Sequence, residues 1–424
     1  MVDMIFTRRD LHQHPEVGFT EFRTASHVVK ILKSLGYQVF YGADAIDLAS
    51  RRGVPADEQL NNAYERAIRD GADVETLSNM KGGLTAVVAT LQGKAPGPTI
   101  AFRFDMDALP IIESEDADHI PANLGFRSVY DGNMHACGHD GHTAIGLALA
   151  ERMTDANFAG TLKLIFQPAE EGGRGAYAMA QKGVVNDVDK LFCLHLGLDT
   201  QLGEIYGGST DFLATTKLMI EFQGVPSHAG ATPEKGRNAL LGAATALLNI
   251  HALPRFSSST TRINVGLLQG GTALNIIPYY AKMLVETRAA DKDANKELER
   301  RVRVIAENSA AMHELDCSVT VIGEATTMTC DEGLVELVLD EARKVEGFSS
   351  FHHYHKAGAS EDASFLIRAV QEHGGQATYM VIGTPIPAPH HNQKFDIDEA
   401  ALPMAVNLLE RIGRRALNGG DTRE

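Results

Sequence analysis

Short apolar strands alternate with helical segments over most of this chain of 424 residues. Near-continuous apolar runs of this kind are typical of strands buried between two layers of helices. We expect strands at 84–91, 99–104, 161–166, 191–196 and 376–382, and helices at 20–35, 143–152, 334–345, 361–372 and 399–415. The alternation predicts an α/β domain, with a mixed sheet and helices on both faces.

The alternation is interrupted between residues 212 and 324. This stretch has the order βαββαβ, which forms a compact ferredoxin-like sandwich by itself. Because the alternation resumes afterwards, we expect a larger domain made of residues 1–211 and 325–424, with residues 212–324 inserted as a second domain. A polar stretch at about 42–80, with helical patterns at 57–69 and 74–80, predicts a smaller helical insertion.

Composition excludes several classes of partner. The net charge is −16, whereas nucleic acids and anionic membranes attract basic surfaces. No apolar run is long enough to span a membrane, and the first residues lack the apolar core of a signal peptide. The four cysteines are scattered and form no CxxC pair, which fits a reducing compartment. We therefore expect a cytoplasmic protein that binds neither nucleic acid nor membrane.

Residues 134–142, Met-His-Ala-Cys-Gly-His-Asp-Gly-His, place a thiol, three imidazoles and a carboxylate within nine positions. Gly138 and Gly141 let the backbone bend so that several of these side chains can converge. Thiolate and imidazole are good ligands for zinc-like ions. The motif indicates a metal site, and the alternative is a buried Cys137 among surface histidines.

Further polar side chains follow other predicted strands. The adjacent Glu170 and Glu171 can divide two tasks, metal binding and proton transfer, or can be a solvated pair at a helix start. His195 ends a strand, where a lone histidine is alternatively a hydrogen-bonded core residue. His390 and His391 lie in a proline-stiffened loop.

Other histidines and acids receive a weaker interpretation. His12 and His14 precede a proline near the N-terminus, and we interpret them as surface or substrate-rim residues. Asp105 and Asp107 come just past a predicted strand, at the sheet edge where ligands of α/β proteins collect.

Six residues share one property, since each lies after a predicted strand or just before a helix: Cys137, His139, Glu170, Glu171, His195 and His391. In a doubly wound sheet such loops meet at one edge. A single catalytic zinc needs three protein ligands, so this larger set fits two ions roughly 3.5–4 Å apart. A glutamate beside an activated water can pass a proton to a leaving nitrogen. The sequence therefore predicts metal-assisted hydrolysis of an amide.

The chain resembles the aminoacylase/carboxypeptidase family of dinuclear amidohydrolases, in the branch that includes hippurate hydrolase. The matching segments span nearly the whole chain in family order: RRDLHQHPE, FRFDMDALP, HACGHDGHTA, IFQPAEEGG, GVPSHAGATPEKGRNAL, GGTALNIIP, ETRA, GASEDA and HHNQKFD. The resemblance implies two divalent ions, zinc or manganese, bound by Cys137, His139, Glu171, His195 and His391. Of the last two histidines, His391 matches better because Asn follows it.

The same resemblance implies roles for the neighbouring acids. Glu170 matches the general base, and Asp107 matches a carboxylate that orients the site without binding metal. Asp105 stands where other branches have a histidine ligand, and His139 is expected to take over that duty. Gln393 departs from the proline common in this branch, which affects the expected loop shape.

The inserted domain resembles the dimerisation lid of the family. His228 would stabilise the tetrahedral oxyanion in the active site of the partner subunit. Asn275 and Arg288 would contact substrate, the arginine through a bidentate pair with a carboxylate. The resemblance implies a homodimer through this lid, or a hetero-dimer with a related subunit.

The resemblance further implies cleavage of an N-acyl or N-aroyl amino acid, with p-aminobenzoyl-glutamate as the leading substrate. Another aromatic conjugate, such as indole-acetyl-aspartate or hippurate, is the alternative within this class. An alternative of another class is a non-catalytic partner subunit of a hetero-oligomer.

Overall fold

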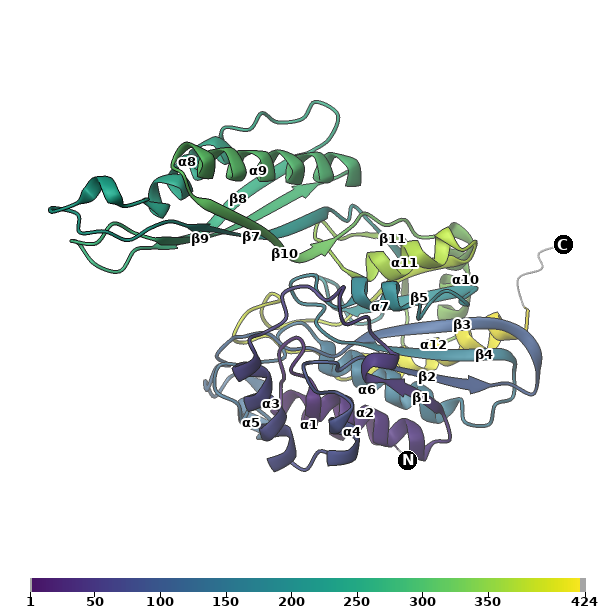
Figure 1. Ribbon diagram of the computed structural model, residues 1–424. Helices are drawn as coiled ribbons and strands as arrows, with labels where there is room; N and C mark the ends of the chain where they lie inside the picture. The colour runs from purple at the N-terminus through teal and green to yellow at the C-terminus, as the bar shows by residue number, and fades with distance from the viewer. Residues whose placement is uncertain (1, 420–424) are drawn as a thin grey trace. The chain divides into compact units, whose positions relative to one another are not determined.

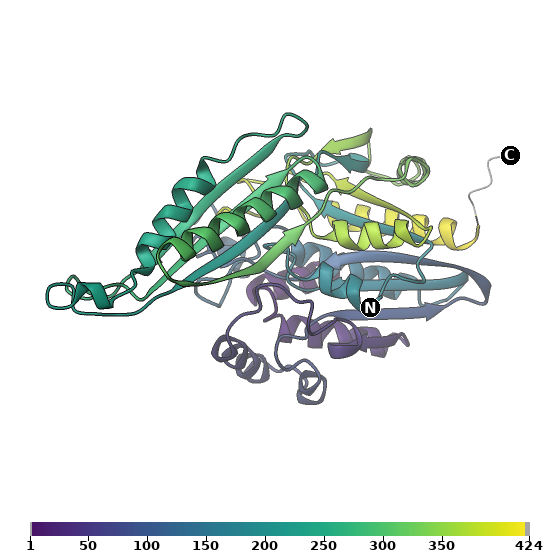
Figure 2. The same ribbon diagram turned by 45° about the horizontal axis from the view of Figure 1, so that its top comes forward.

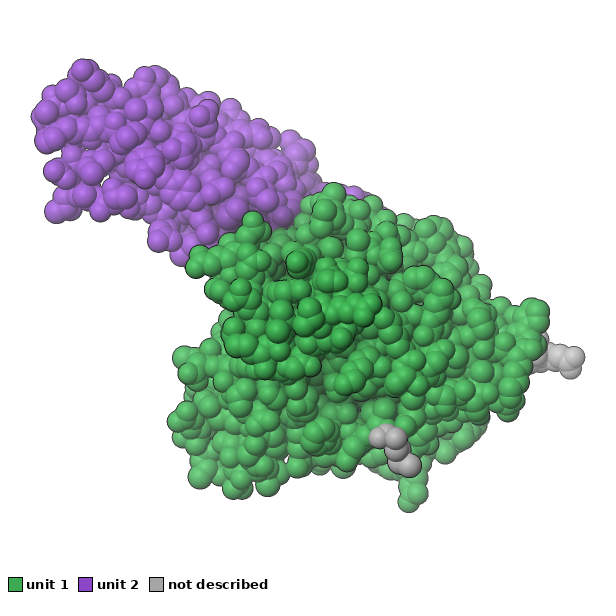
Figure 3. Space-filling model, turned by 60° about the horizontal axis from the view of Figure 1, so that its bottom comes forward, with its two compact units in different colours: residues 1–210, 328–357, 362–424 green, residues 211–327, 358–361 purple. Residues whose placement is uncertain are grey.

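A computed structural model describes residues 2–419 of the chain (Figure 1; Figure 2). It divides into two compact units, which are coloured separately in Figure 3. Unit 1 comprises residues 1–210, 328–357 and 362–424, and unit 2 comprises residues 211–327 and 358–361. Unit 2 is therefore an insertion in the chain of unit 1.

Unit 1 is built on one eight-stranded mixed sheet with the order β1-β2-β4-β3-β5-β12-β6-β11. The strands β4, β3, β5 and β12 run parallel, whereas β2 and β6 run antiparallel to their neighbours β4 and β12. Their bounds are β1 (Gln38–Tyr41), β2 (Val87–Gln92), β3 (Ala95–Asp105), β4 (Ala159–Gln167), β5 (Lys190–Leu196), β6 (Glu204–Thr210), β11 (Ser350–Lys356) and β12 (Gln376–Ile382). The predicted α/β class with a mixed sheet is confirmed.

Helices cover both faces of this sheet (Figure 1). On one face α6 packs against both α2 and α12, and all three helices contribute to an apolar core with side chains of the strands. On the other face α7 packs with α11. The bounds are α1 (Met4–Gln13), α2 (Phe22–Ser34), α3 (Asp57–Arg69), α4 (Val74–Ser78), α5 (Ile120–Leu124), α6 (His139–Arg152), α7 (Ala176–Lys182), α10 (Glu332–Ala342), α11 (Ala363–Glu372) and α12 (Ala401–Leu417), with a short 3-10 helix at Gly42–Asp44.

Two features of unit 1 differ from the sequence prediction. Helix α6 begins at His139, four residues earlier than expected, so His139 and His142 belong to its first turn. The strands β1, β6 and β11 were not predicted, because β1 is short, β6 contains two glycines and β11 is rich in histidine. No helix within residues 2–419 has the length and apolar character needed to cross a membrane.

Unit 2 is a four-stranded antiparallel sheet with the order β10-β7-β9-β8, and Figure 2 shows α8 and α9 side by side across one face. Apolar side chains from the sheet and both helices, most of them small or branched, form its core. Along the chain the elements are β7 (Ala214–Gln223), a 3-10 turn (Pro233–Lys235), α8 (Ala239–His251), β8 (Thr261–Gly270), β9 (Tyr280–Ala289), α9 (Lys292–Met312) and β10 (Asp316–Ala325). This is a βαββαβ order.

Candidate metal centre and active site

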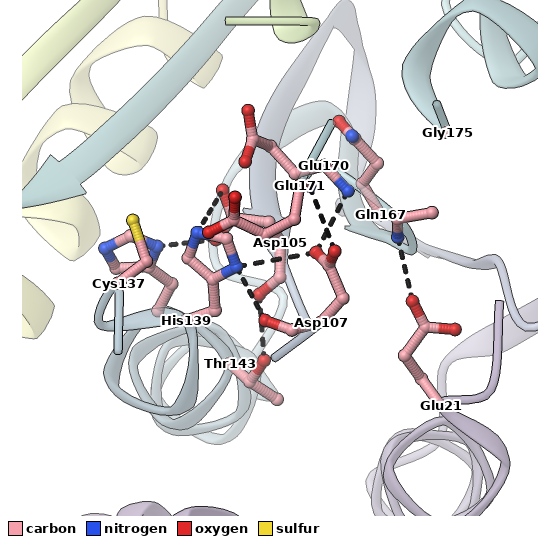
Figure 4. A network of polar contacts seen from close by, with 12 residues as sticks. Glu21, Asp105, Asp107, Cys137, His139, Thr143, Gln167, Glu170, Glu171 and Gly175 are labelled. Atoms are coloured by element: carbon pink, nitrogen blue, oxygen red, sulfur yellow. Dashed lines mark hydrogen bonds and ion pairs between the residues drawn. The ribbon is translucent and has the colours of Figure 1, made fainter. Parts of the chain in front are cut away.

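Asp107 lies at the middle of the candidate site, just past the end of β3 (Figure 4). Its two carboxylate oxygens accept hydrogen bonds from the backbone N–H groups of Glu170 and Glu171, at 2.9 and 3.0 Å. Ala169 before them has a φ of 52°, and this left-handed turn aims both N–H groups at one carboxylate. The backbone carbonyl of Asp107 accepts a hydrogen bond from His139 Nδ1 at 2.8 Å. Asp107 therefore ties together the segments after β3 and β4 and the start of α6.

Cys137, His139 and His195 form one group of potential metal ligands, with ligand atoms within 4.8 Å of one another. The Cys137 sulfur lies 3.6 Å from His195 Nε2. His195 Nδ1 donates to the Leu196 carbonyl at 2.8 Å, which leaves the Nε2 lone pair facing the sulfur. Burial first, and then the nearby His142, lower the pKa of His195 well below its usual value. The neutral ring is the form that binds metal.

Cys137 also belongs to a second group, with Glu171 and His391. His391 Nε2 lies 3.3 Å from a Glu171 carboxylate oxygen. His391 has a φ of 63°, a left-handed conformation that is uncommon outside glycine and marks a constrained position in the loop after β12. His390 instead packs its ring against those of His195 and Phe395.

Glu170 completes the candidate site in a third group with His139 and Glu171. The structure therefore brings together all six residues that the sequence analysis selected, although they come from four separate segments of unit 1. The metal-binding and catalytic roles of these residues stay predictions.

The donor set fits divalent cations. Within residues 2–419, His139 Nε2 and Glu171 Oε1 are buried and make no hydrogen bond, and Glu171 Oε1 is the oxygen that lies 3.3 Å from His391 Nε2. Burial lowers the pKa of His139, but Asp105 and then Cys137 outweigh it and raise that pKa well above its usual value, so these surroundings favour positive charge. Buried acceptor atoms in a negative environment, with the imidazoles of His139 and His195 each oriented by the second nitrogen, are the features of a metal site.

His142 and Asp105 are positioned for a supporting role that the sequence analysis did not assign. His142 Nδ1 lies 2.5 Å from Asp105 Oδ1, and its Nε2 accepts a hydrogen bond from the backbone N–H of Leu196 at 3.0 Å. Asp105 also pairs with Arg103 at 2.5 Å and stands 3.7 Å from His139 Nε2. The imidazole thus links two strand ends beside the ligands. Its spacing of three residues from His139, on one helix face, was the available signal.

The expectation for the N-terminal histidines is wrong for His12. It is fully buried and bridges two carboxylates, Asp140 at 2.8 Å and Glu113 at 2.9 Å. His14 is half-buried and hydrogen-bonds the carbonyl of Asp10. Both partners of His12 are more than 100 residues away in the chain, so the residues next to His12 in the sequence do not indicate them.

In unit 2, His228 and Asn275 lie on adjacent segments, since Ala229 N–H donates to the Asn275 carbonyl at 3.0 Å. His228 is exposed, and its Nδ1 accepts hydrogen bonds from the N–H groups of Gly230 and Ala231 at 3.1 and 3.0 Å. The neutral ring therefore carries its proton on Nε2, where it can donate to a ligand.

Arg288 lies near the C-terminal end of β9, whereas Asn275 precedes the N-terminal end of that strand. Its Nε and Nη2 donate to the two carboxylate oxygens of Glu286, at 3.0 and 2.9 Å, and its Nη1 donates to Ser360 Oγ at 3.4 Å. The bidentate pair expected with a substrate carboxylate is thus formed here with a neighbouring side chain. A substrate would use the remaining N–H groups of Nη1 and Nη2, or would displace Glu286.

Comparison with known proteins agrees with this geometry. The family model of peptidase family M20/M25/M40 matches residues 101–415. The chain is 45% identical over 410 residues to indole-3-acetyl-aspartic acid hydrolase from Enterobacter agglomerans, covering 96% of this chain and 94% of the relative. It is 43% identical over 414 residues to one of the subunits of p-aminobenzoyl-glutamate hydrolase from Escherichia coli, covering 97% and 94%.

Solved structures of related proteins also resemble this chain over nearly its whole length. An aminobenzoyl-glutamate utilization protein from Klebsiella pneumoniae superposes with a TM-score of 0.85 at 41% identity, covering 98% of this chain and 95% of that one. A Bacillus subtilis protein described as a dinuclear metal binding peptidase of the M20 family has a TM-score of 0.65 at 25% identity, covering 98% and 97%. The chain belongs to peptidase family M20/M25/M40. It is a metal-dependent amidohydrolase, as the sequence analysis predicted.

Proposed function

We propose that this chain hydrolyses the amide bond between an aromatic acyl group and an acidic amino acid, with p-aminobenzoyl-glutamate as the leading substrate. The names of two relatives that match nearly the whole chain support this class, since both combine an aromatic acyl half with glutamate or aspartate. Indole-3-acetyl-aspartate is the second candidate. Hippurate, an aromatic conjugate with glycine in place of the acidic amino acid, is the third. A substrate series that varies the acyl and amino-acid halves separately distinguishes them.

Cys137, His139, Glu171, His195 and His391 would hold two divalent ions, zinc or manganese. The observation that carries this proposal is that the Cys137 sulfur belongs to two separate groups of three ligands. A thiolate in that position can serve both ions. Sulfur and imidazole favour zinc, and elemental analysis of the purified protein identifies the metal.

The ions, when bound, would polarise the amide carbonyl and acidify a water molecule. Glu170 would take the proton of that water and deliver it to the leaving nitrogen. Asp107 would keep Glu170 and Glu171 in place through its hydrogen bonds to their backbone. His228 would donate its Nε2 proton in a hydrogen bond to the developing oxyanion.

Exchange of one glutamate at a time tests this assignment. Glu170→Gln should lower kcat about 100-fold to 10,000-fold, because the general base is lost, while the metal content stays at two ions per chain. Glu171→Gln should lower the metal content itself, because a ligand is lost. Elemental analysis and steady-state kinetics on the same samples give both readouts. Near-normal turnover by Glu170→Gln would refute the base assignment.

We also propose that the active unit is a dimer formed through unit 2. Arg288 and Asn275 are separated by the length of β9, and eight residues of strand span roughly 26 Å. One N-aroyl amino acid is too short to touch both groups on one chain. If a second copy of the chain supplies His228 and Asn275, one substrate can contact these two residues and also Arg288 of the first copy. A related protein could take the place of the second copy, since one relative is itself named as a subunit of a hydrolase.

Two further points complete the proposal. The free cysteines Cys137, Cys193, Cys317 and Cys330 support a reducing compartment, and we place the protein in the cytoplasm. If the chain is instead a non-catalytic partner in a hetero-oligomer, the purified chain alone should show no turnover of any aroyl-glutamate with any divalent metal.

A further inference from the structure

Arg8 on α1 is surrounded by three carboxylates from distant parts of unit 1. Its Nε lies 2.8 Å from Asp140, its Nη2 pairs with Asp396, and its Nη1 lies 3.2 Å from Glu399. The Arg8 side chain is 1% exposed, so its charge is not screened by solvent. A planar guanidinium can serve three acceptors at once, which the single ammonium of lysine does less well.

Each of these carboxylates adjoins a segment that carries a proposed metal ligand. Asp140 directly follows His139 in the first turn of α6. Asp396 and Glu399 lie a few residues after His391, in the segment that leads into α12. Arg8 therefore connects the two ligand segments across the interior of the unit, and it touches neither ligand.

The neighbouring Arg9 provides a contrast. It donates to Glu399 from Nε and Nη2, at 2.9 and 2.6 Å, but it is partly exposed and contacts neither Asp140 nor Asp396. The two arginines thus share one acid, and only Arg8 reaches the acid beside His139. Without Arg8, the buried carboxylates of Asp140 and Asp396 would lose the cation between them and repel each other.

We propose that Arg8 is a positioning residue for the metal centre, which sets the separation of the His139 and His391 segments and thereby the affinity for metal. This inference rests on the proposed metal site. It gives a function to the N-terminal RRDLHQHPE segment, which supplies no ligand of the proposed site. Residues that orient metal ligands from behind typically contribute 10-fold to 100-fold in metal affinity.

The test measures the Zn²⁺ affinity of folded protein by competition with a chelator, well below the unfolding temperature. Arg8→Gln and Arg8→Lys should bind Zn²⁺ about 10-fold to 100-fold more weakly than wild type. Arg9→Gln is the matched control and should stay close to wild type. At saturating Zn²⁺, Arg8→Lys should recover much of its kcat with KM unchanged, because excess metal compensates for weaker binding.

Each outcome has a distinct meaning. Wild-type protein that binds no divalent metal would overturn the proposed function, and this inference with it. If wild type binds Zn²⁺ and Arg8→Lys binds it with the same affinity, this inference alone is overturned. A lower melting temperature with unchanged affinity would also overturn it, because that result assigns Arg8 a purely structural role. If Arg8→Gln fails to fold, Arg8→Lys decides the question, because it keeps the positive charge.

Discussion

Single hydrogen bonds prepare the proposed ligands for metal. His139 and His195 each donate from Nδ1 to a backbone carbonyl, at 2.8 Å in both cases, so each presents the lone pair of Nε2. Both acceptors are main-chain atoms at or just past strand ends, so the sheet helps to fix the ring orientation. The Asp107 carboxylate, 3.4 Å from His139 Nδ1, is a second group that orients the His139 ring.

His12 leads to a prediction about pH. It is buried between Arg8, Asp140, Glu113 and His135, and it contacts a carboxylate with each ring nitrogen, which requires the charged ring. Burial opposes that charge, but Asp140 and Glu113 raise the pKa of His12 to about 9. A histidine in the unfolded chain titrates near 6.5. The charged ring therefore contributes stability that is fully present below about pH 6.5 and is lost as the pH rises through about 9.

His12→Gln should accordingly be less stable than wild type by on the order of 3 kcal/mol near pH 6.5, and the difference should shrink towards pH 9. Urea unfolding of both proteins at several pH values measures it. A difference that does not change with pH would show that the pKa of His12 is the same in the folded and unfolded protein, and would contradict the prediction.

At the scale of the element, α6 depends on close approach to the sheet. A Cβ built on Gly146 would lie 2.7 Å from a ring carbon of Phe104 on β3 and 2.8 Å from one of Phe166 on β4. Both rings are buried and in contact with each other, with centroids 5.4 Å apart, so neither has room to move. The glycine thus lets the helix that begins with His139 lie directly on the strands that end at the site.

Gly146→Ala should therefore destabilise the protein by about 1–3 kcal/mol, although alanine favours helix. Gly333→Ala in α10 is the matched control, because Gly333 is exposed and its new Cβ would meet no atom closer than 3.8 Å. That variant should be neutral or more stable by up to about 1 kcal/mol. The urea concentration at which half of the protein is unfolded, measured for both variants, compares their stabilities. Equal stability of both variants would contradict the steric explanation.

At the scale of the whole molecule, the proposed dimer predicts complementation. A chain with Glu170→Gln and a chain with His228→Ala should each be inactive alone. In a mixed dimer one site would combine an intact Glu170 with an intact His228. Random pairing makes half of the dimers mixed, so co-expression should restore about a quarter of the wild-type activity.

The matched control pairs Glu170→Gln with Glu171→Gln. Both changes then affect the same site of their own chain, so every mixed dimer carries two damaged sites and no activity should return. If the pair that contains His228→Ala also fails to recover, the histidine acts within its own chain. If the His228→Ala chain is active alone, the histidine takes no part in the reaction.

The apolar strands β2, β3, β4, β5 and β12 of the large sheet, the helices α2, α6, α10, α11 and α12, and the chemical identity of the six clustered residues could be predicted from the sequence. Each of these depends on local patterns, such as apolar periodicity or a chelating motif, that short stretches of chain already contain. Polar strands such as β11 lack that pattern, and only pairing with β6 makes them strands.

The tertiary structure alone decided which charges are paired. The contacts of Arg8 with Asp396, of His12 with Glu113 and of His142 with the amide of Leu196 join residues 54 to 388 positions apart. Nothing in the local sequence specifies such partners, because a buried charge is stable only where packing delivers the opposite charge to it.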